Sequence, residues 1–180
     1  KKLQNTSEDK LFEDALNRLN GLIKMGTGAV EIKSGYGLTL DAEIKMLRVI
    51  KRLKENSDVT IKATFLGAHA LPKEFNGNKD DYMDLVINEM LPKVAEEKLV
   101  DYVDIFCEEG YFTVDDTKKL LKEANKFGIK AKTHVNQFNA IGGVKASIDL
   151  GALSVDHLEE MNEGDFDALS GSDCMPTILP

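Results

Sequence analysis

Apolar residues along the chain alternate between short strand-like runs and segments with the period of a helix. The predicted strands cover residues 29–33, 60–67, 100–107, 129–134, 152–157 and 173–179. Predicted helices separate them: 7–24, one capped by Thr39, a longer one ending near Leu99, one from Thr113 to 127, and two short ones near 144–148 and 166–169. Strands that alternate with helices in this way predict an α/β fold with a parallel sheet and right-handed crossovers.

Two α/β architectures satisfy this pattern, an open doubly wound sheet and a (β/α)8 TIM-type barrel. The nearest glycine-rich turn, Ser34–Gly37, lacks the spacing of a dinucleotide or P-loop fingerprint. Residues with chemical potential follow many different strands instead: Tyr36, His69, Glu108, His134, Gln137 and His157. Chemistry supplied by several strand ends is typical of the barrel, so we predict a segment of about six βα units from a (β/α)8 barrel that two further strands would close.

All three histidines of the chain lie at the carboxyl ends of predicted strands. They are His69, His134 and His157. Histidine is the usual metal ligand and the usual proton carrier near neutral pH, and a βα-barrel builds its active site at this end of its strands. One such histidine would be read as an ordinary core or loop residue. Three in the same topological position indicate a catalytic site.

Composition narrows the function classes. The 180 residues are 42% hydrophobic with a net charge of −8, which predicts one globular domain, or a large piece of one, and argues against a nucleic-acid partner. No apolar run approaches the roughly 20 residues that span a bilayer, and the polar start predicts no secretory signal. Cys107 and Cys174 have no CxxC spacing, so we expect reduced, buried strand residues in a cytoplasmic protein.

Five segments carry a resemblance to a known family. They are Val30–Leu38, Thr64–Ala70, Asp104–Glu108, Lys132–His134 and Ser154–Leu158. With these segments the chain resembles the imidazolonepropionases, metal-dependent cyclic amidases of histidine degradation in the amidohydrolase superfamily. The resemblance implies that residues 1–180 are a partial catalytic barrel domain, strands two to seven. The first and last strands, with further metal ligands, and a small β-domain would then lie outside these residues.

The resemblance also implies roles for individual residues. His134 matches the metal-binding histidine of the fifth strand, and His157 matches a catalytic histidine near the attacking water or the reacting carbonyl. Tyr36 and His69 match residues that contact the substrate. Gln137 stands where well-known members have a glutamate that binds substrate or the attacking water, and glutamine cannot accept a proton at neutral pH.

The implied activity is hydrolysis of 4-imidazolone-5-propanoate to N-formimidoyl-L-glutamate with one divalent metal ion, zinc or iron. A single metal is expected because the segment 106–110 carries no bridging lysine. The implied partners are a small-molecule substrate and, in the full-length protein, a second copy in a homodimer; no nucleic acid and no membrane are expected.

Several alternatives stay open at this stage. The ring substrate could differ, giving another cyclic amidase or a deaminase, with Gln137 as the main support. The isolated chain could be an inactive fragment with exposed sheet edges that associate. Tyr36 could only pack over the barrel end, and Gln137 could be a hydrogen-bonding residue behind the substrate contacts. Glu108 and Glu109 are interpreted as solvated loop charges.

Overall fold

A single parallel sheet organises the computed structural model, which describes residues 2–178. Its six strands follow one another in chain order. They are β1 Ala29–Lys33, β2 Thr60–Ala68, β3 Tyr102–Cys107, β4 Lys130–Val135, β5 Ser154–His157 and β6 Met175–Ile178. Each neighbouring pair is parallel, which confirms the predicted α/β topology. The last predicted strand reached Leu179, which lies outside the described residues.

Helical segments precede the first strand and connect each strand to the next. They are α1 Lys2–Asn5, α2 Glu8–Lys24, α3 Leu40–Glu55, η1 Lys73–Phe75, α4 Lys79–Leu85, η2 Val86–Met90, α5 Leu91–Glu96, α6 Val114–Lys126, α7 Gly143–Asp149 and α8 Glu163–Ser170. The hydroxyls of Ser7, Thr39 and Thr113 accept from backbone N–H groups in the first turns of α2, α3 and α6. These side chains satisfy donors that a helix start leaves without a partner, so the predicted helix starts are confirmed.

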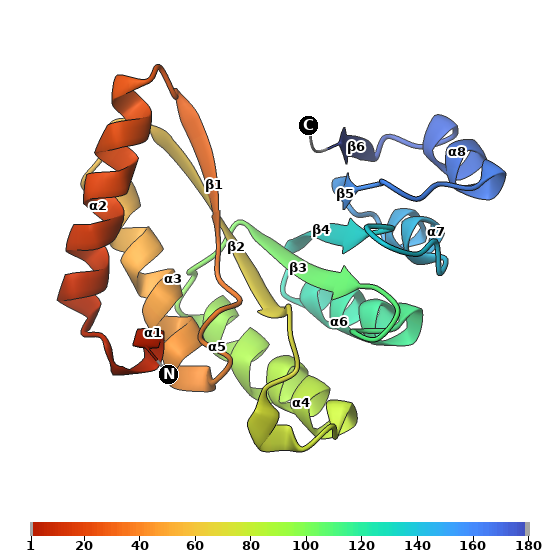
Figure 1. The fold of residues 1–180 in the computed structure, drawn as a ribbon, viewed down its shortest axis with the longest axis horizontal. Helices are drawn as coiled ribbons and strands as arrows, with labels where there is room; N and C mark the ends of the chain where they lie inside the picture. The colour runs from red at the N-terminus through yellow and green to blue at the C-terminus, as the bar shows by residue number, and fades with distance from the viewer. Residues whose placement is uncertain (1, 179–180) are drawn as a thin grey trace.

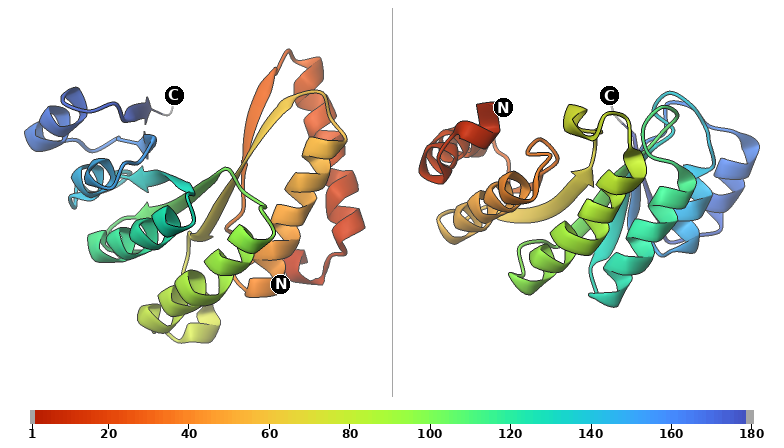
Figure 2. Two further views of the ribbon diagram at one scale, coloured as in Figure 1. Left: turned by 180° about the vertical axis from the view of Figure 1, so that it is seen from behind. Right: turned by 90° about the horizontal axis from the view of Figure 1, so that it is seen from below.

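The sheet curls, and its helices lie along the outer side of the curve (Figures 1 and 2). The result is the six-unit segment of a βα-barrel that the strand and helix pattern predicted. Because all strands are parallel, their carboxyl ends meet at one edge of the sheet. Predicted site residues that follow different strands are therefore collected at the same end of the molecule.

The two faces of the curled sheet differ in chemistry. The convex face, under the helices, carries the apolar core, with Phe65, Ile105 and Val155 fully buried. The concave face carries charged side chains, among them Lys33 and Asp104. Successive residues of a strand point to opposite faces, so Asp104 and Ile105, neighbours in β3, belong to the two different environments.

Two helical features depart from the sequence prediction. The helix expected to run to about Leu99 ends at Glu96 and contains a π-helical segment, Val86–Met90, just before Pro92 in α5. Proline has no N–H to donate to the preceding turn, which accounts for the irregularity. The short helix α1 was not predicted. None of the helices within residues 2–178 is long and apolar enough to cross a membrane.

Candidate functional site at the carboxyl edge of the sheet

The three histidines lie at the carboxyl edge of the sheet. His69 directly follows β2, His134 is the second-last residue of β4, and His157 ends β5. Two contacts join predicted site residues: Tyr36 meets His69 edge-on with ring centroids 5.2 Å apart, and the rings of His134 and His157 are 5.1 Å apart. The structure thus brings the predicted residues together as two pairs.

Phe106 connects these two pairs. Its ring centroid lies 6.2 Å from that of His69 and 6.4 Å from that of His134. Tyr111, at 4.5 Å, and Phe138, at 6.4 Å, flank the same ring. A continuous row of rings therefore crosses the edge of the sheet. Sequence reasoning missed Phe106, although its position two residues after Asp104 places it on the concave face.

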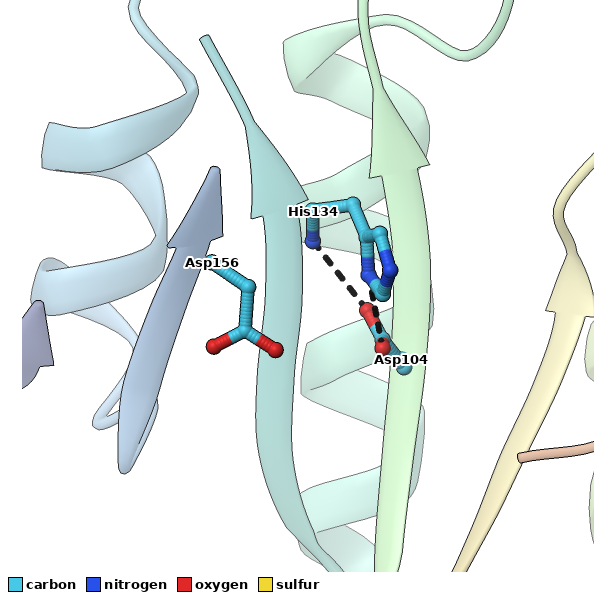
Figure 3. Close-up of side chains that lie close together, drawn as sticks. All are labelled: Asp104, His134 and Asp156. Atoms are coloured by element: carbon cyan, nitrogen blue, oxygen red, sulfur yellow. Dashed lines mark hydrogen bonds and ion pairs between the residues drawn. The ribbon is translucent and has the colours of Figure 1, made fainter. Parts of the chain in front are cut away.

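Asp104 of the neighbouring strand β3 contacts both the ring and the backbone of His134. Imidazole Nδ1 lies 2.8 Å from Asp104 Oδ2, and the backbone N–H of His134 donates to Oδ1 over 3.2 Å (Figure 3). The distance between Nδ1 and Oδ2 is that of an ion pair, but the direction of the contact is not that of a hydrogen bond. Within the described residues Nδ1 has no hydrogen-bond partner. Asp104 thus fixes the side of the ring that carries Nδ1.

Asp104, His134 and Asp156 form a candidate metal-binding group. They come from three adjacent strands, point to the side of the sheet away from the helices, and have ligand atoms within 4.8 Å of one another (Figure 3). Imidazole and carboxylate are both donors for zinc and iron. The ammonium of Lys33 lies 2.9 Å from Asp104 Oδ2 and 3.4 Å from Asp156 Oδ2, so a cation already faces the two carboxylates.

A network of charges continues from this group across the concave face. Glu31 pairs with Lys33 and Lys132, and Lys132 also lies 4.0 Å from Asp156. Burial lowers the pKa of Lys33, but the carboxylates of Asp104 and Glu31 outweigh it and raise this pKa. Burial raises the pKa of Asp104, but the imidazole of His134 and the ammonium of Lys33 outweigh it and lower it. Lys33 and Asp104 therefore stay charged at neutral pH.

The loops at this edge hold unusual backbone conformations. His157 has φ 91° and Leu158 φ 65°, while Leu38 and Asn136 have φ 59° and φ 56°. Such values cost non-glycine residues about 1–3 kcal/mol each and persist where the surroundings impose them, often at functional sites. The chain therefore carries this strain where it leaves each of the strands β1, β4 and β5.

Gln137 belongs to neither histidine pair. It is half-buried in the loop after β4, three residues beyond His134. The prediction that Glu108 is a solvated loop charge is wrong: its side chain is 1% exposed and accepts hydrogen bonds from the loop that carries Gln137. Glu109 is exposed, as predicted. The sequence gives no signal that separates the buried Glu108 from the exposed Glu109, because both are glutamates in the same loop after a strand.

Both cysteines are free and buried. Cys107 lies in β3, and Cys174 directly precedes β6. Burial raises the pKa of each thiol. The predicted role of small buried residues is confirmed.

No family model matches the chain. Curated relatives do. The imidazolonepropionase of Christiangramia forsetii is 61% identical over 180 residues, and that of Flavobacterium johnsoniae is 56% identical over the same length; each alignment covers 100% of this chain and 44% of the relative. The imidazolonepropionase of Clostridium tetani is 42% identical over 174 residues, 97% of this chain and 42% of its own. The chain thus spans less than half the length of the curated relatives it matches.

Solved structures resemble the fold. A mutant atrazine chlorohydrolase from Arthrobacter aurescens, in complex with zinc and atraton, matches with a TM-score of 0.66 and 12% identity over 96% of this chain and 43% of its own. An ochratoxinase from A. niger matches with a TM-score of 0.53 and 12% identity over 83% of this chain and 40% of its own. The fold therefore defines a segment of a βα-barrel. By its sequence, the chain belongs to the imidazolonepropionase family, as the resemblance predicted.

Proposed function

We propose that residues 1–180 are part of the catalytic barrel of an imidazolonepropionase, corresponding to its second to seventh strands. The complete protein, meaning a chain of the relatives' length that contains these residues, would hydrolyse 4-imidazolone-5-propanoate to N-formimidoyl-L-glutamate. The observation that carries the proposal is sequence identity along the whole chain to curated imidazolonepropionases. The clustering of the predicted residues at the carboxyl edge supports it.

His134 is the proposed ligand for one divalent metal ion, zinc or iron. Because Nδ1 faces the carboxylate of Asp104, Nε2 is the nitrogen left for a metal, which is the usual arrangement of a metal-bound histidine backed by a carboxylate. Asp104 and Asp156 face the ammonium of Lys33 and are not proposed as ligands, so the remaining ligands would come from outside these residues. When bound, the metal would supply an activated water and polarise the lactam carbonyl.

The chain's own residues take the other proposed roles. His157, whose ring lies 5.1 Å from that of His134, would move a proton to the lactam nitrogen as the C–N bond breaks and water oxygen bonds to the carbonyl carbon. Tyr36 and His69 bind the flat ring, against the row of aromatic side chains centred on Phe106. Gln137 hydrogen-bonds to the substrate or the attacking water without accepting a proton.

Loss of the ultraviolet absorbance of imidazolone-propanoate tests this function. The complete protein should turn the substrate over, a chelator should abolish turnover, and zinc or iron should restore it. His134→Ala should remove both turnover and bound metal. The 180-residue chain alone should show neither. The complete protein is further proposed to be cytoplasmic and to form a homodimer. Sedimentation of the complete protein tests the homodimer.

Gln137 motivates a second candidate, a related cyclic amidase or a deaminase that acts on another ring. A panel of cyclic amides and amino-substituted rings separates the two functions. Turnover of a panel member at least 100-fold faster than of imidazolone-propanoate would favour the second candidate. Gln137→Glu should then leave imidazolone hydrolysis slow, whereas under the first candidate the same variant should preserve or raise it.

A further inference from the structure

Among residues 2–178, two buried glutamates each accept from a cluster of N–H groups and form no ion pair. The side chain of Glu43, in the first turn of α3, is fully buried. Its Oε2 accepts from the backbone N–H of Gly35 at 2.8 Å, and its Oε1 accepts from Gly37 at 2.6 Å and Leu38 at 2.9 Å. Within residues 2–178 the carboxylate has no ion-pair partner.

Glu108, directly after β3, repeats this arrangement at a different loop. Its Oε2 accepts from the backbone N–H of Phe138 at 2.9 Å and of Asn139 at 3.3 Å. Its Oε1 accepts from the backbone of Glu109 at 2.8 Å and from the amide of Asn139 at 3.1 Å. Burial raises the pKa of Glu108, but these donors outweigh it and lower the pKa below its ordinary value. The side chain is therefore ionised at neutral pH.

Each carboxylate holds the loop that carries a proposed substrate-binding residue. The donors Gly35 and Gly37 stand on either side of Tyr36, and the donors Phe138 and Asn139 directly follow Gln137. The first loop closes tightly onto α3, since a Cβ on Gly37 would lie 2.6 Å from the backbone N of Glu43. The glutamates thus fix the backbone next to these two side chains rather than the side chains themselves.

A side chain that ends in two acceptor oxygens suits these clusters. Its two oxygens accept from all of the N–H groups at once, whereas a glutamine would turn an NH₂ group toward N–H donors. Burying a charge that lacks a cation is costly, and an apolar side chain would fill the same space without that cost. Stability alone therefore does not explain the two buried glutamates, whereas their hydrogen bonds to the loop backbones fix the geometry of those loops.

We propose that Glu43 and Glu108 are positioning residues that fix the orientation of Tyr36 and Gln137 toward the substrate. This inference rests on the proposed function, which places both side chains at the imidazolone ring. Each glutamate acts on its own loop, so the two should act independently of each other. Within residues 2–178 neither forms a hydrogen bond or ion pair with His134, so neither should alter metal binding.

Double-mutant cycles in the complete protein test the pairing. Glu43→Gln should raise KM at least 10-fold. In the Glu43→Gln background, Tyr36→Phe should raise KM by less than a further 2-fold, because the loop that orients Tyr36 is already released. Glu108→Gln should be coupled in the same way to Gln137→Ala. The crossed pairs, Glu43→Gln with Gln137→Ala and Glu108→Gln with Tyr36→Phe, should be multiplicative within about 2-fold. Multiplicative effects in all four pairs would overturn the proposal.

Matched controls separate positioning from general destabilisation. Asp41→Asn, in the same helix turn as Glu43, and Glu109→Gln, next to Glu108, change exposed carboxyls and should leave KM unchanged. Metal content should stay at the wild-type value in Glu43→Gln and Glu108→Gln. Loss of metal together with a uniform fall in kcat would show a merely structural role.

Hydrogen exchange of the unsubstituted protein gives a test that requires no variant to fold. The amides of Gly37, Leu38, Phe138 and Asn139 lie outside helices and strands, yet each donates to a buried carboxylate. They should exchange at least 100-fold more slowly than unprotected amides. Exchange at unprotected rates would overturn the proposal. Slow exchange in a protein that does not hydrolyse imidazolone-propanoate would instead locate the failure in the proposed function.

Discussion

The two faces of strand β3 show how this chain separates stability from chemistry. Ile105 points under the helices and Asp104 points into the concave face, and both side chains are fully buried. Ile105 packs among apolar neighbours, where burial itself is favourable. Asp104 is buried against Lys33 and His134, where only pairing and hydrogen bonds offset the cost of removing a charge from water.

The two faces therefore tolerate different substitutions. The convex face depends on volume and shape, and any apolar side chain of similar size fits there at a small cost. On the concave face each charge is specified by its partners, because a single removal leaves another charge buried without compensation. The proposed metal ligand His134 belongs to this second face, so its position is coupled to the charge network.

The largest expected effect comes from removing one charge of that network. Asp104→Ala should lower the free energy of unfolding by about 3–5 kcal/mol, because Lys33 and His134 lose a buried partner. Urea unfolding of the chain, followed by circular dichroism, measures it. The double variant Lys33→Met with Asp104→Leu is the control and should recover at least half of the loss. A single variant that costs under about 1 kcal/mol would contradict the comparison.

Acid should act on the same network. The pKa values of Glu31 and Asp104 are lowered in the folded chain. Burial opposes this, but Lys132, Thr64 and Lys33 together outweigh it for Glu31, and His134 and Lys33 together outweigh it for Asp104. The unfolded chain therefore binds more protons below about pH 4, so the stabilisation is present above that pH and is lost as pH falls through the folded values. Unfolding free energies measured from pH 7 to pH 3 should fall in this range, and less steeply in the double variant. Equal slopes in the two proteins would count against the network as the cause.

Much of the fold, and part of the site, could be predicted from these residues. The period of apolar positions and the capping hydroxyls predicted the elements, and strand-end histidines predicted the edge where they meet. The charged concave face was missed although Glu31, Lys33 and Lys132 alternate with apolar residues in β1 and β4, a period-two signal that was available. Glu43 could not have been found, because its partners are backbone N–H groups that only the folded loop brings together.

A smaller effect is expected on the convex face. Ile105→Val removes one buried methylene and should cost about 1 kcal/mol, because the surrounding core relaxes only in part. Ile23→Val, at a position 38% exposed in α2, is the matched control and should change stability by less than about 0.5 kcal/mol. Both are measured by urea unfolding at constant m-value. If Ile105→Val matched Asp104→Ala in cost, the two faces would not differ as argued.

The smallest effect should come from an ion pair outside the barrel. Arg48 of α3 and Glu97, just after α5, form a two-pronged pair with N–O distances of 2.9 and 2.7 Å, but the Arg48 side chain is 47% exposed. Water already solvates these charges, so Glu97→Gln should cost only about 0.5 kcal/mol, and about 0.5 M salt should remove most of that difference. The cost of Asp104→Ala should barely change with the same salt, because the Asp104 side chain is fully buried. Unfolding free energies of both variants and the wild type at low and high salt provide the test. A salt-resistant loss at Glu97 as large as that at Asp104 would show that pairing alone, rather than burial on the concave face, sets the strength of these charges.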